Sequence, residues 1–112
     1  MEIIAFQVQG SAEEPYLVTF SRGLSGFTAA CSCPAGQSRQ SCKHRLGILD
    51  GSSKGVVSSN IEQVAVVAAW LPGSRVAEAR QLLAAAEAEL ERAKKGVSSA
   101  KSALAAALHV AP

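Results

Sequence analysis

Three cysteines and one histidine lie within a single stretch of this sequence, CSCPAGQSRQSCKH. They form the pattern Cys-x-Cys, eight residues, then Cys-x-His, with Cys31, Cys33, Cys42 and His44 at the four positions. The chain contains no other cysteine. Thiolate sulfur and imidazole nitrogen are donors that Zn²⁺ prefers, usually four in a tetrahedron. The types and spacing of these residues therefore predict one zinc ion held by all four side chains.

Other uses of the cysteines fit less well. Three is an odd number, so disulfide pairing would leave one thiol over, and a bridge between Cys31 and Cys33 would close a small, strained ring. A nucleophilic pair of Cys42 and His44 lacks a third group to orient it, and a catalytic zinc needs an open position that a Cys3His set fills. We therefore expect a structural zinc, no enzymatic activity, no small-molecule substrate, and a reducing, cytoplasmic location.

The elements around the cluster are predicted from hydrophobic periodicity. Alternating apolar residues indicate strands at 3–9, 16–20 and 27–30, and a helix is expected to begin near residue 42 and to end near Gly51. These elements make only about 50 residues, a size at which a hydrophobic core alone is marginal. The sequence thus predicts an α+β fold: a small ββα-type zinc module with an N-terminal antiparallel sheet, stabilised by its metal.

Residues 16–50 resemble the SWIM-type zinc finger. The similarity lies in YLVTF at 16–20, Phe27, CSCP at 31–34 and CKHRL at 42–46. The resemblance implies a ββα scaffold with zinc bound by the Cys-x-Cys and Cys-x-His ligands. It also implies a binding module, with roles in DNA binding or protein–protein contact, and no catalyst.

The second half of the chain reads as helical. We divide the chain into a zinc module at 1–51, a linker at 52–59 and a helical region at 60–112. Ser59 to Glu62 match a capping box that would start a short helix over 60–71. The pair Pro72-Gly73 would end that helix, and Ser74 would cap a long one over 74–109.

The long helix carries a heptad seam, with aliphatic residues at one core position and alanine at the other. Its members are Val76, Ala79, Leu83, Ala86, Leu90, Ala93, Val97, Ala100, Leu104 and Ala107. The register passes through Gly96 without a slip, which favours one continuous helix. Three occupants could cover the seam: the 60–71 helix folded back as a helical hairpin, a second copy in a coiled coil, or a partner protein.

Four basic residues are candidates for contacting nucleic acid: Arg22, Arg39, Lys43 and Arg45. Residues 16–49 contain no Asp or Glu, although part of this positive charge would only balance a zinc tris-thiolate. The net charge of +2 is too small to indicate a polyanion binder by itself. Our first hypothesis is an accessory factor that binds nucleic acid and a protein partner. The alternative is a protein–protein adaptor or small inhibitor that recognises its partner through the C-terminal helices.

Two further expectations concern location and packing. The start of the chain lacks the basic residues of a signal peptide, and the longest apolar run, 64–71, is too short to cross a membrane. We therefore expect no membrane partner. Trp70, the only tryptophan, is expected in the core, with a role as a partner anchor left open.

Overall fold

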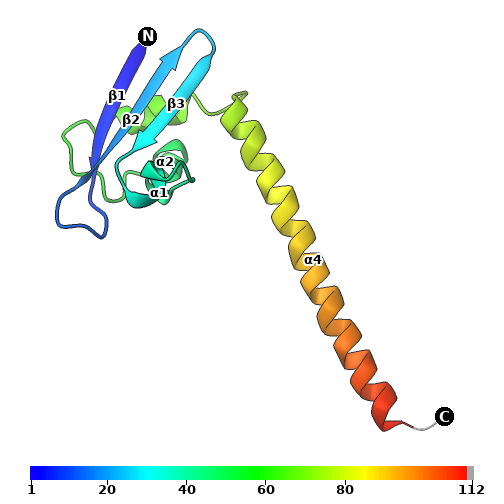
Figure 1. Cartoon of the computed structure of the whole chain (residues 1–112). Coiled ribbons are helices and arrows are strands. Elements are labelled where there is room, and N and C mark those ends of the chain that lie inside the picture. The colour runs from blue at the N-terminus through cyan, green and yellow to red at the C-terminus, as the bar shows by residue number, and fades with distance from the viewer. Residues whose placement is uncertain (111–112) are drawn as a thin grey trace. The chain divides into compact units, whose positions relative to one another are not determined.

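The computed structural model describes residues 1–110 and divides into two compact units, Met1–Arg75 and Val76–Pro112. The first unit contains a three-stranded sheet and three short helices, and the second is built on one long helix (Figure 1). The first unit extends to Arg75, well beyond the boundary at residue 51 that the sequence suggested. The α+β class predicted from the sequence is confirmed.

The sheet is antiparallel with the strand order β1-β2-β3. Its strands are β1 (Glu2–Val8), β2 (Tyr16–Gly23) and β3 (Gly26–Cys31). Strands β2 and β3 extend beyond the predicted ranges of 16–20 and 27–30, so only Leu24 and Ser25 join them. Leu24 and Ser25 both keep negative φ, and Gly26, the first residue of β3, takes a φ of +125° that is accessible to glycine.

The core lies on one face of the sheet. The predicted alternation holds in the middle of the strands, where Ile4, Phe6 and Val8 of β1 and Val18 and Phe20 of β2 are buried and the residues between them are not. Phe6 and Phe20 are fully buried and meet edge to face, with ring centroids 6.0 Å apart. Trp70 is also buried and packs against Phe27, which assigns it to the core.

The segment expected to be a linker lies along the open edge of β1. Val56 forms a bridge with Val8, Gln9 donates its backbone N–H to the carbonyl of Gly55, and Val57 donates to the carbonyl of Gln7. An unpaired edge strand exposes donors and acceptors that can recruit other chains. This pairing satisfies those groups and joins residues 55–57 to the sheet.

The short helix differs from the prediction. Helix α3 spans Gln63–Ala68, with Glu62 at its N-cap position and no side-chain cap hydrogen bond, so the predicted capping box at Ser59 is wrong. The polar residues before this helix form hydrogen bonds with the backbone of β1 at the edge of the sheet. The side-chain amide of Asn60 donates to the carbonyl of Ala5, and the Ser58 hydroxyl accepts from the backbone N–H of Gln7.

Helix α4 (Arg75–His109) is unbroken, so the backbone passes through Gly96 in helical conformation, as the heptad register predicted. Within this range, all of which the structure describes, no residue is buried. The apolar residues of α3, by contrast, are buried at Val64 and Val67 within the first unit.

Candidate metal centre

The structure brings the four predicted ligands together. One ligand atom from each of Cys31, Cys33, Cys42 and His44 lies within 4.8 Å of the other three. Cys31 ends β3, Cys33 precedes α1 (Pro34–Gln37), and Cys42 precedes α2 (Lys43–Leu49), which carries His44. The three cysteines are buried free thiols, and His44 is partly exposed.

Ser32 fixes the turn between the first two cysteines. Its backbone N–H donates to the carbonyl of Leu17, and its hydroxyl accepts from the backbone N–H of Leu17. Leu17 lies on β2, so these two bonds prolong the pairing of β2 and β3 by one step. The side chains of Cys31 and Cys33 are thereby directed to the same place from one residue apart.

The ring of His44 has a defined orientation. Its Nδ1 lies 3.8 Å from Sγ of Cys31, whereas a Cβ added at Gly10 would lie 3.0 Å from its Nε2. The Tyr16 ring covers the imidazole, with ring centroids 5.0 Å apart. Nδ1 is therefore the nitrogen presented to a metal.

Gly36 supports the second cysteine. Its backbone N–H donates to Sγ of Cys33 at 3.3 Å. A Cβ at this position would lie 2.2 Å from the carbonyl oxygen of Cys31, which is a clash with rigid backbone. Only glycine can bring this N–H to the thiolate. No local sequence pattern indicated this close approach.

Arg45 is an internal brace, and the structure does not present it as a phosphate contact. Its Nε donates to Sγ of Cys42 at 3.2 Å, Nη1 donates to the carbonyl of Ala29 at 3.2 Å, and Nη2 donates to the carbonyl of Gln40. The guanidinium thus ties together β3, the segment before α2 and one ligand sulfur. Its positive charge also offsets the negative charge of a thiolate.

Burial and neighbouring charges shift the pKa values of three of the four ligands in different directions. Burial raises the pKa of the Cys31 thiol to about 12. Burial also acts to raise the pKa of Cys42, but hydrogen bonds from the Arg45 backbone and side chain outweigh it and lower that pKa. Burial, together with the charge of Lys43, lowers the pKa of His44 and favours the neutral imidazole that a metal requires. A metal ion binding here would displace the proton of Cys31.

The geometry fits a closed four-coordinate metal. In a zinc tetrahedron with Zn–S bonds of about 2.3 Å, neighbouring sulfurs lie about 3.8 Å apart. The observed limit of 4.8 Å is thus about 1 Å wider than a metal-bound cluster. The cluster could hold one metal ion, and three sulfurs and one nitrogen would fill a tetrahedron without an open position.

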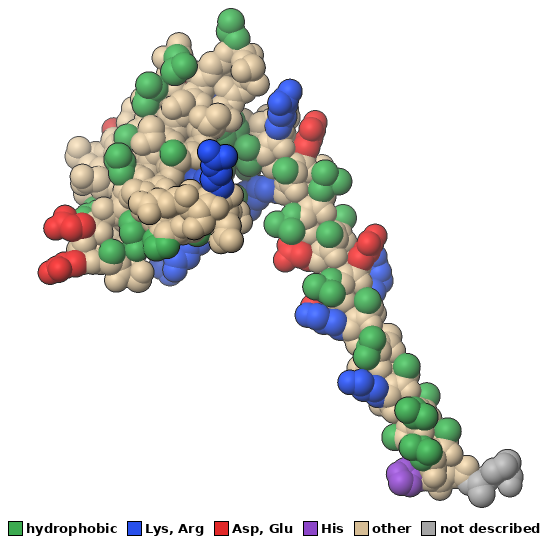
Figure 2. Space-filling model, in the orientation of Figure 1, with side chains coloured by type: hydrophobic (Ala, Val, Ile, Leu, Met, Phe, Trp, Pro, Cys, Tyr) green, Lys and Arg blue, Asp and Glu red, His purple; other side chains and the backbone are tan. Residues whose placement is uncertain are grey.

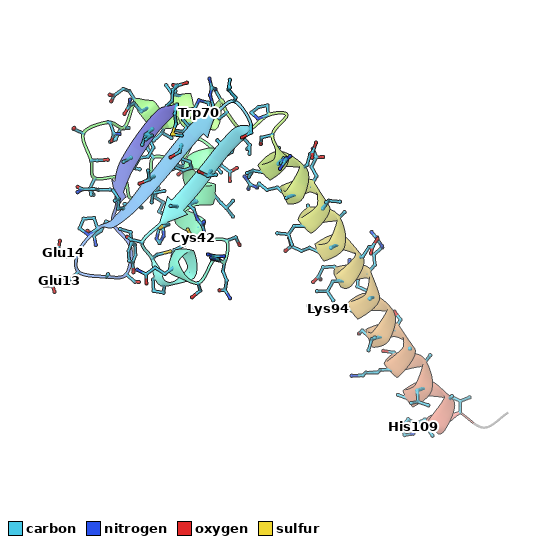
Figure 3. The ribbon with its side chains drawn as sticks, turned by 45° about the horizontal axis from the view of Figure 1, so that its top comes forward. Glu13, Glu14, Cys42, Trp70, Lys94 and His109 are labelled. Carbon is cyan, nitrogen blue, oxygen red and sulfur yellow. The ribbon has the colours of Figure 1, made fainter. Side chains whose placement is uncertain are left out.

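The four predicted basic residues do not form one surface. Arg22 pairs with Glu2 at 3.2 Å and stacks over the Trp70 ring, and Trp70 lies at the opposite end of the sheet from Cys42 (Figure 3). Arg45 points inward. Arg39 and Lys43 are exposed.

Lys54 is a basic residue near the cluster that the sequence reading did not include. With Lys43 and His44 it lines a hollow of about 540 Å³, which Gly10, Gly47 and Ile48 also line. Within residues 1–110, neither Lys43 nor Lys54 forms a salt bridge. No sequence signal placed Lys54 here, because residues 43 and 54 meet only through the fold.

The predicted seam lies along α4. Its aliphatic members Leu83, Leu90, Val97 and Leu104 are each more than half exposed, and the alanines from Ala79 onward are exposed as well. Val76, the first member, is partly exposed.

Comparisons of the chain with protein-family models, with curated proteins and with solved structures found no match. The chemistry of the cluster and the exposed helix are therefore the grounds for a function. None of the helices in residues 1–110 is both long and apolar enough to cross a membrane.

Proposed function

We propose that the chain is a non-enzymatic assembly factor. Residues 1–75 form a SWIM-like module with one structural zinc, and α4 binds a protein partner. One observation carries the proposal: a helix of 35 residues buries none of them, yet keeps an unbroken seam of aliphatic residues and alanine. A helix of this kind obtains most of its stability from a partner that covers its apolar face.

The zinc assignment is supported by the donor set. Soft thiolate ligands select zinc over magnesium or calcium, and a closed Cys3His site suits structure more than catalysis. Two hydrogen bonds to ligand sulfurs, from Gly36 and Arg45, supply the outer support expected of such a site. We expect one zinc per chain by elemental analysis, and a tetrahedral spectrum after cobalt substitution.

The assembly role is tested by changing the seam alone. The double variant Leu83→Lys/Leu90→Lys places charge on the seam, and Gln81→Lys/Ala88→Lys places the same charge on the opposite face. We expect the wild type and the control to sediment as complexes in extracts of expressing cells, and the seam variant to sediment as a monomer with its zinc retained. A wild type that is monomeric in both extract and purified form would overturn the proposal.

Nucleic-acid binding is a second candidate function, favoured by the hollow that carries Lys43 and Lys54. Two lysines that form no salt bridge within residues 1–110, beside a concave surface, suit a phosphate group. The test is a titration of the zinc-loaded chain with duplex and single-stranded DNA at several salt concentrations. Lys43→Gln/Lys54→Gln should lower the slope of log K against log salt by about 2, and Arg22→Gln should leave the slope unchanged. Absence of binding at low salt would remove this candidate.

A further inference from the structure

The two core positions of the α4 seam carry side chains of different size. One position carries Val76, Leu83, Leu90, Val97 and Leu104, and the other carries alanine in all five heptads. Apolar side chains run along this helix, with charged ones between them (Figure 2). A seam that is half alanine lets a neighbouring helix approach to the short end of the usual 8–10 Å range.

We propose that a second copy of this chain covers the seam, with its α4 running antiparallel to the first. This inference rests on the proposed assembly function and names the partner. When the helix is aligned against a reversed copy of itself so that Val76 lies opposite the partner's Ala107, Leu83 lies opposite the partner's Ala100. In the same alignment, Leu90 lies opposite the partner's Ala93. Every aliphatic residue of the seam of one helix then meets an alanine of the other.

A parallel pair would pack poorly. In a parallel, in-register coiled coil, each core position meets its own equivalent. Layers with Leu90 against the partner's Leu90 would alternate with layers of two alanines. One interhelical distance cannot suit both, because a separation wide enough for paired leucines leaves cavities between paired alanines. The antiparallel arrangement avoids this conflict because all of its layers have similar volume.

The charged residues beside the seam do not favour an antiparallel over a parallel helix pair. The antiparallel pair brings Glu87 near the partner's Lys94, and a parallel pair would bring Glu89 near it instead. Each arrangement also places one pair of basic residues together towards the helix ends. Packing of the seam is therefore what selects the antiparallel pair.

The seam is also complementary to itself, which favours a second copy over an unrelated helix. A two-fold axis requires one surface to match itself after rotation. Here the reversed pattern pairs large with small in every heptad, from Val76 to Ala107. An unrelated partner would need no such match within this chain.

The first test is sedimentation equilibrium of the purified, zinc-loaded full chain with one substitution in the seam. Ala93→Leu would place two leucines in each of two antiparallel layers, so we expect the dimer Kd to rise about tenfold or more. Ala88→Leu adds the same side chain on the opposite face, and we expect it to change Kd less than about twofold. Combining Leu90→Ala with Ala93→Leu should restore most of the affinity, because each layer again holds one large and one small residue.

Several outcomes would overturn the inference. A tighter dimer with Ala93→Leu would indicate a parallel pair, in which the new leucines fill the alanine layers. A purified wild type that stays monomeric, yet forms a seam-dependent complex in cell extract, would remove the second copy and leave the assembly function standing. A monomer under both conditions would remove both.

A distance measurement tests the direction independently. Because the cysteines are metal ligands, a spin label is introduced at Gln81 through a non-natural amino acid. In the antiparallel pair residue 81 lies opposite the partner's residue 102, so the two labels are separated by about 32 Å along the axis. In a parallel pair they lie at the same height. A distribution without the long axial separation would overturn the proposed direction.

Discussion

At the scale of single residues, the metal site depends on Gly36 because glycine has no Cβ. Its N–H reaches Sγ of Cys33 only because no Cβ meets the carbonyl of Cys31. Gly36→Ala should lower the free energy of unfolding by about 1–3 kcal/mol, since the backbone must move at two ligands. Denaturant unfolding with zinc present measures this change.

Gly47 is the matched control for that prediction. It lies in α2 near the same site, and a Cβ there meets nothing within 4 Å. Gly47→Ala should be neutral or stabilise by up to about 1 kcal/mol, because alanine favours helix. Equal losses for the two variants would contradict the role assigned to Gly36.

Arg45 leads to a prediction about metal affinity. Arg45→Met keeps much of the aliphatic stem and removes the three donations to Cys42, Ala29 and Gln40. Loss of outer-sphere support typically costs 10–100-fold in metal affinity, so we expect a weakening of about that size in competition with a chromophoric chelator. Arg39→Met makes the same change at an exposed residue and should leave affinity unchanged. Parallel losses in both variants would show that Arg45 acts only through general charge.

These residues show which parts of the site the sequence could predict. The four ligands were predictable because donor type and spacing are local properties of the chain. The roles of Gly36 and Arg45 were not, since one depends on a backbone contact and the other on which way a long side chain turns. A basic residue directly after a ligand histidine, as Arg45 is, fits a surface contact and an internal hydrogen-bond donor equally well.

At the scale of elements, the edge of β1 shows why a local motif can mislead. Ser59 to Glu62 match a capping box, but Asn60 and the Ser58 hydroxyl are bonded to β1, and the helix starts later without a cap. The strands were predicted more closely, because alternation of apolar residues reports directly on a half-buried sheet. Nothing in a local pattern reveals that a distant strand has open hydrogen-bonding groups to satisfy.

The two interpretations of this segment make opposite predictions. Asn60→Ala should cost about 1–3 kcal/mol, because the carbonyl of Ala5 and the side chains of Ser58 and Gln63 lose their partner. Ser59→Ala should cost less than about 0.5 kcal/mol, whereas a true capping serine would cost about 1 kcal/mol. Thermal and denaturant unfolding of the two variants separate the cases. A larger loss at Ser59 than at Asn60 would restore the capping box.

At the scale of the whole molecule, the two units should respond differently to loss of metal. The first unit has a small core and would use zinc as part of its stability, because metal binding and folding are coupled in modules of this size. Helix α4 holds 35 residues, far more than the 4, 7 and 6 of α1, α2 and α3, and it contains no ligand. A chelator should therefore unfold residues 1–75 and leave most of the helical signal.

One residue makes this experiment direct. Trp70 is the only tryptophan and is buried in the first unit against Phe27, so its fluorescence reports on that unit alone. On chelation we expect its emission to shift to the red as it enters water, while circular dichroism at 222 nm, which is dominated by α4, falls only slightly. Added zinc should reverse the shift. A chain that loses its metal without any change at Trp70 would show that the first unit folds by its core alone. Simultaneous loss of both signals would show that α4 depends on the zinc module.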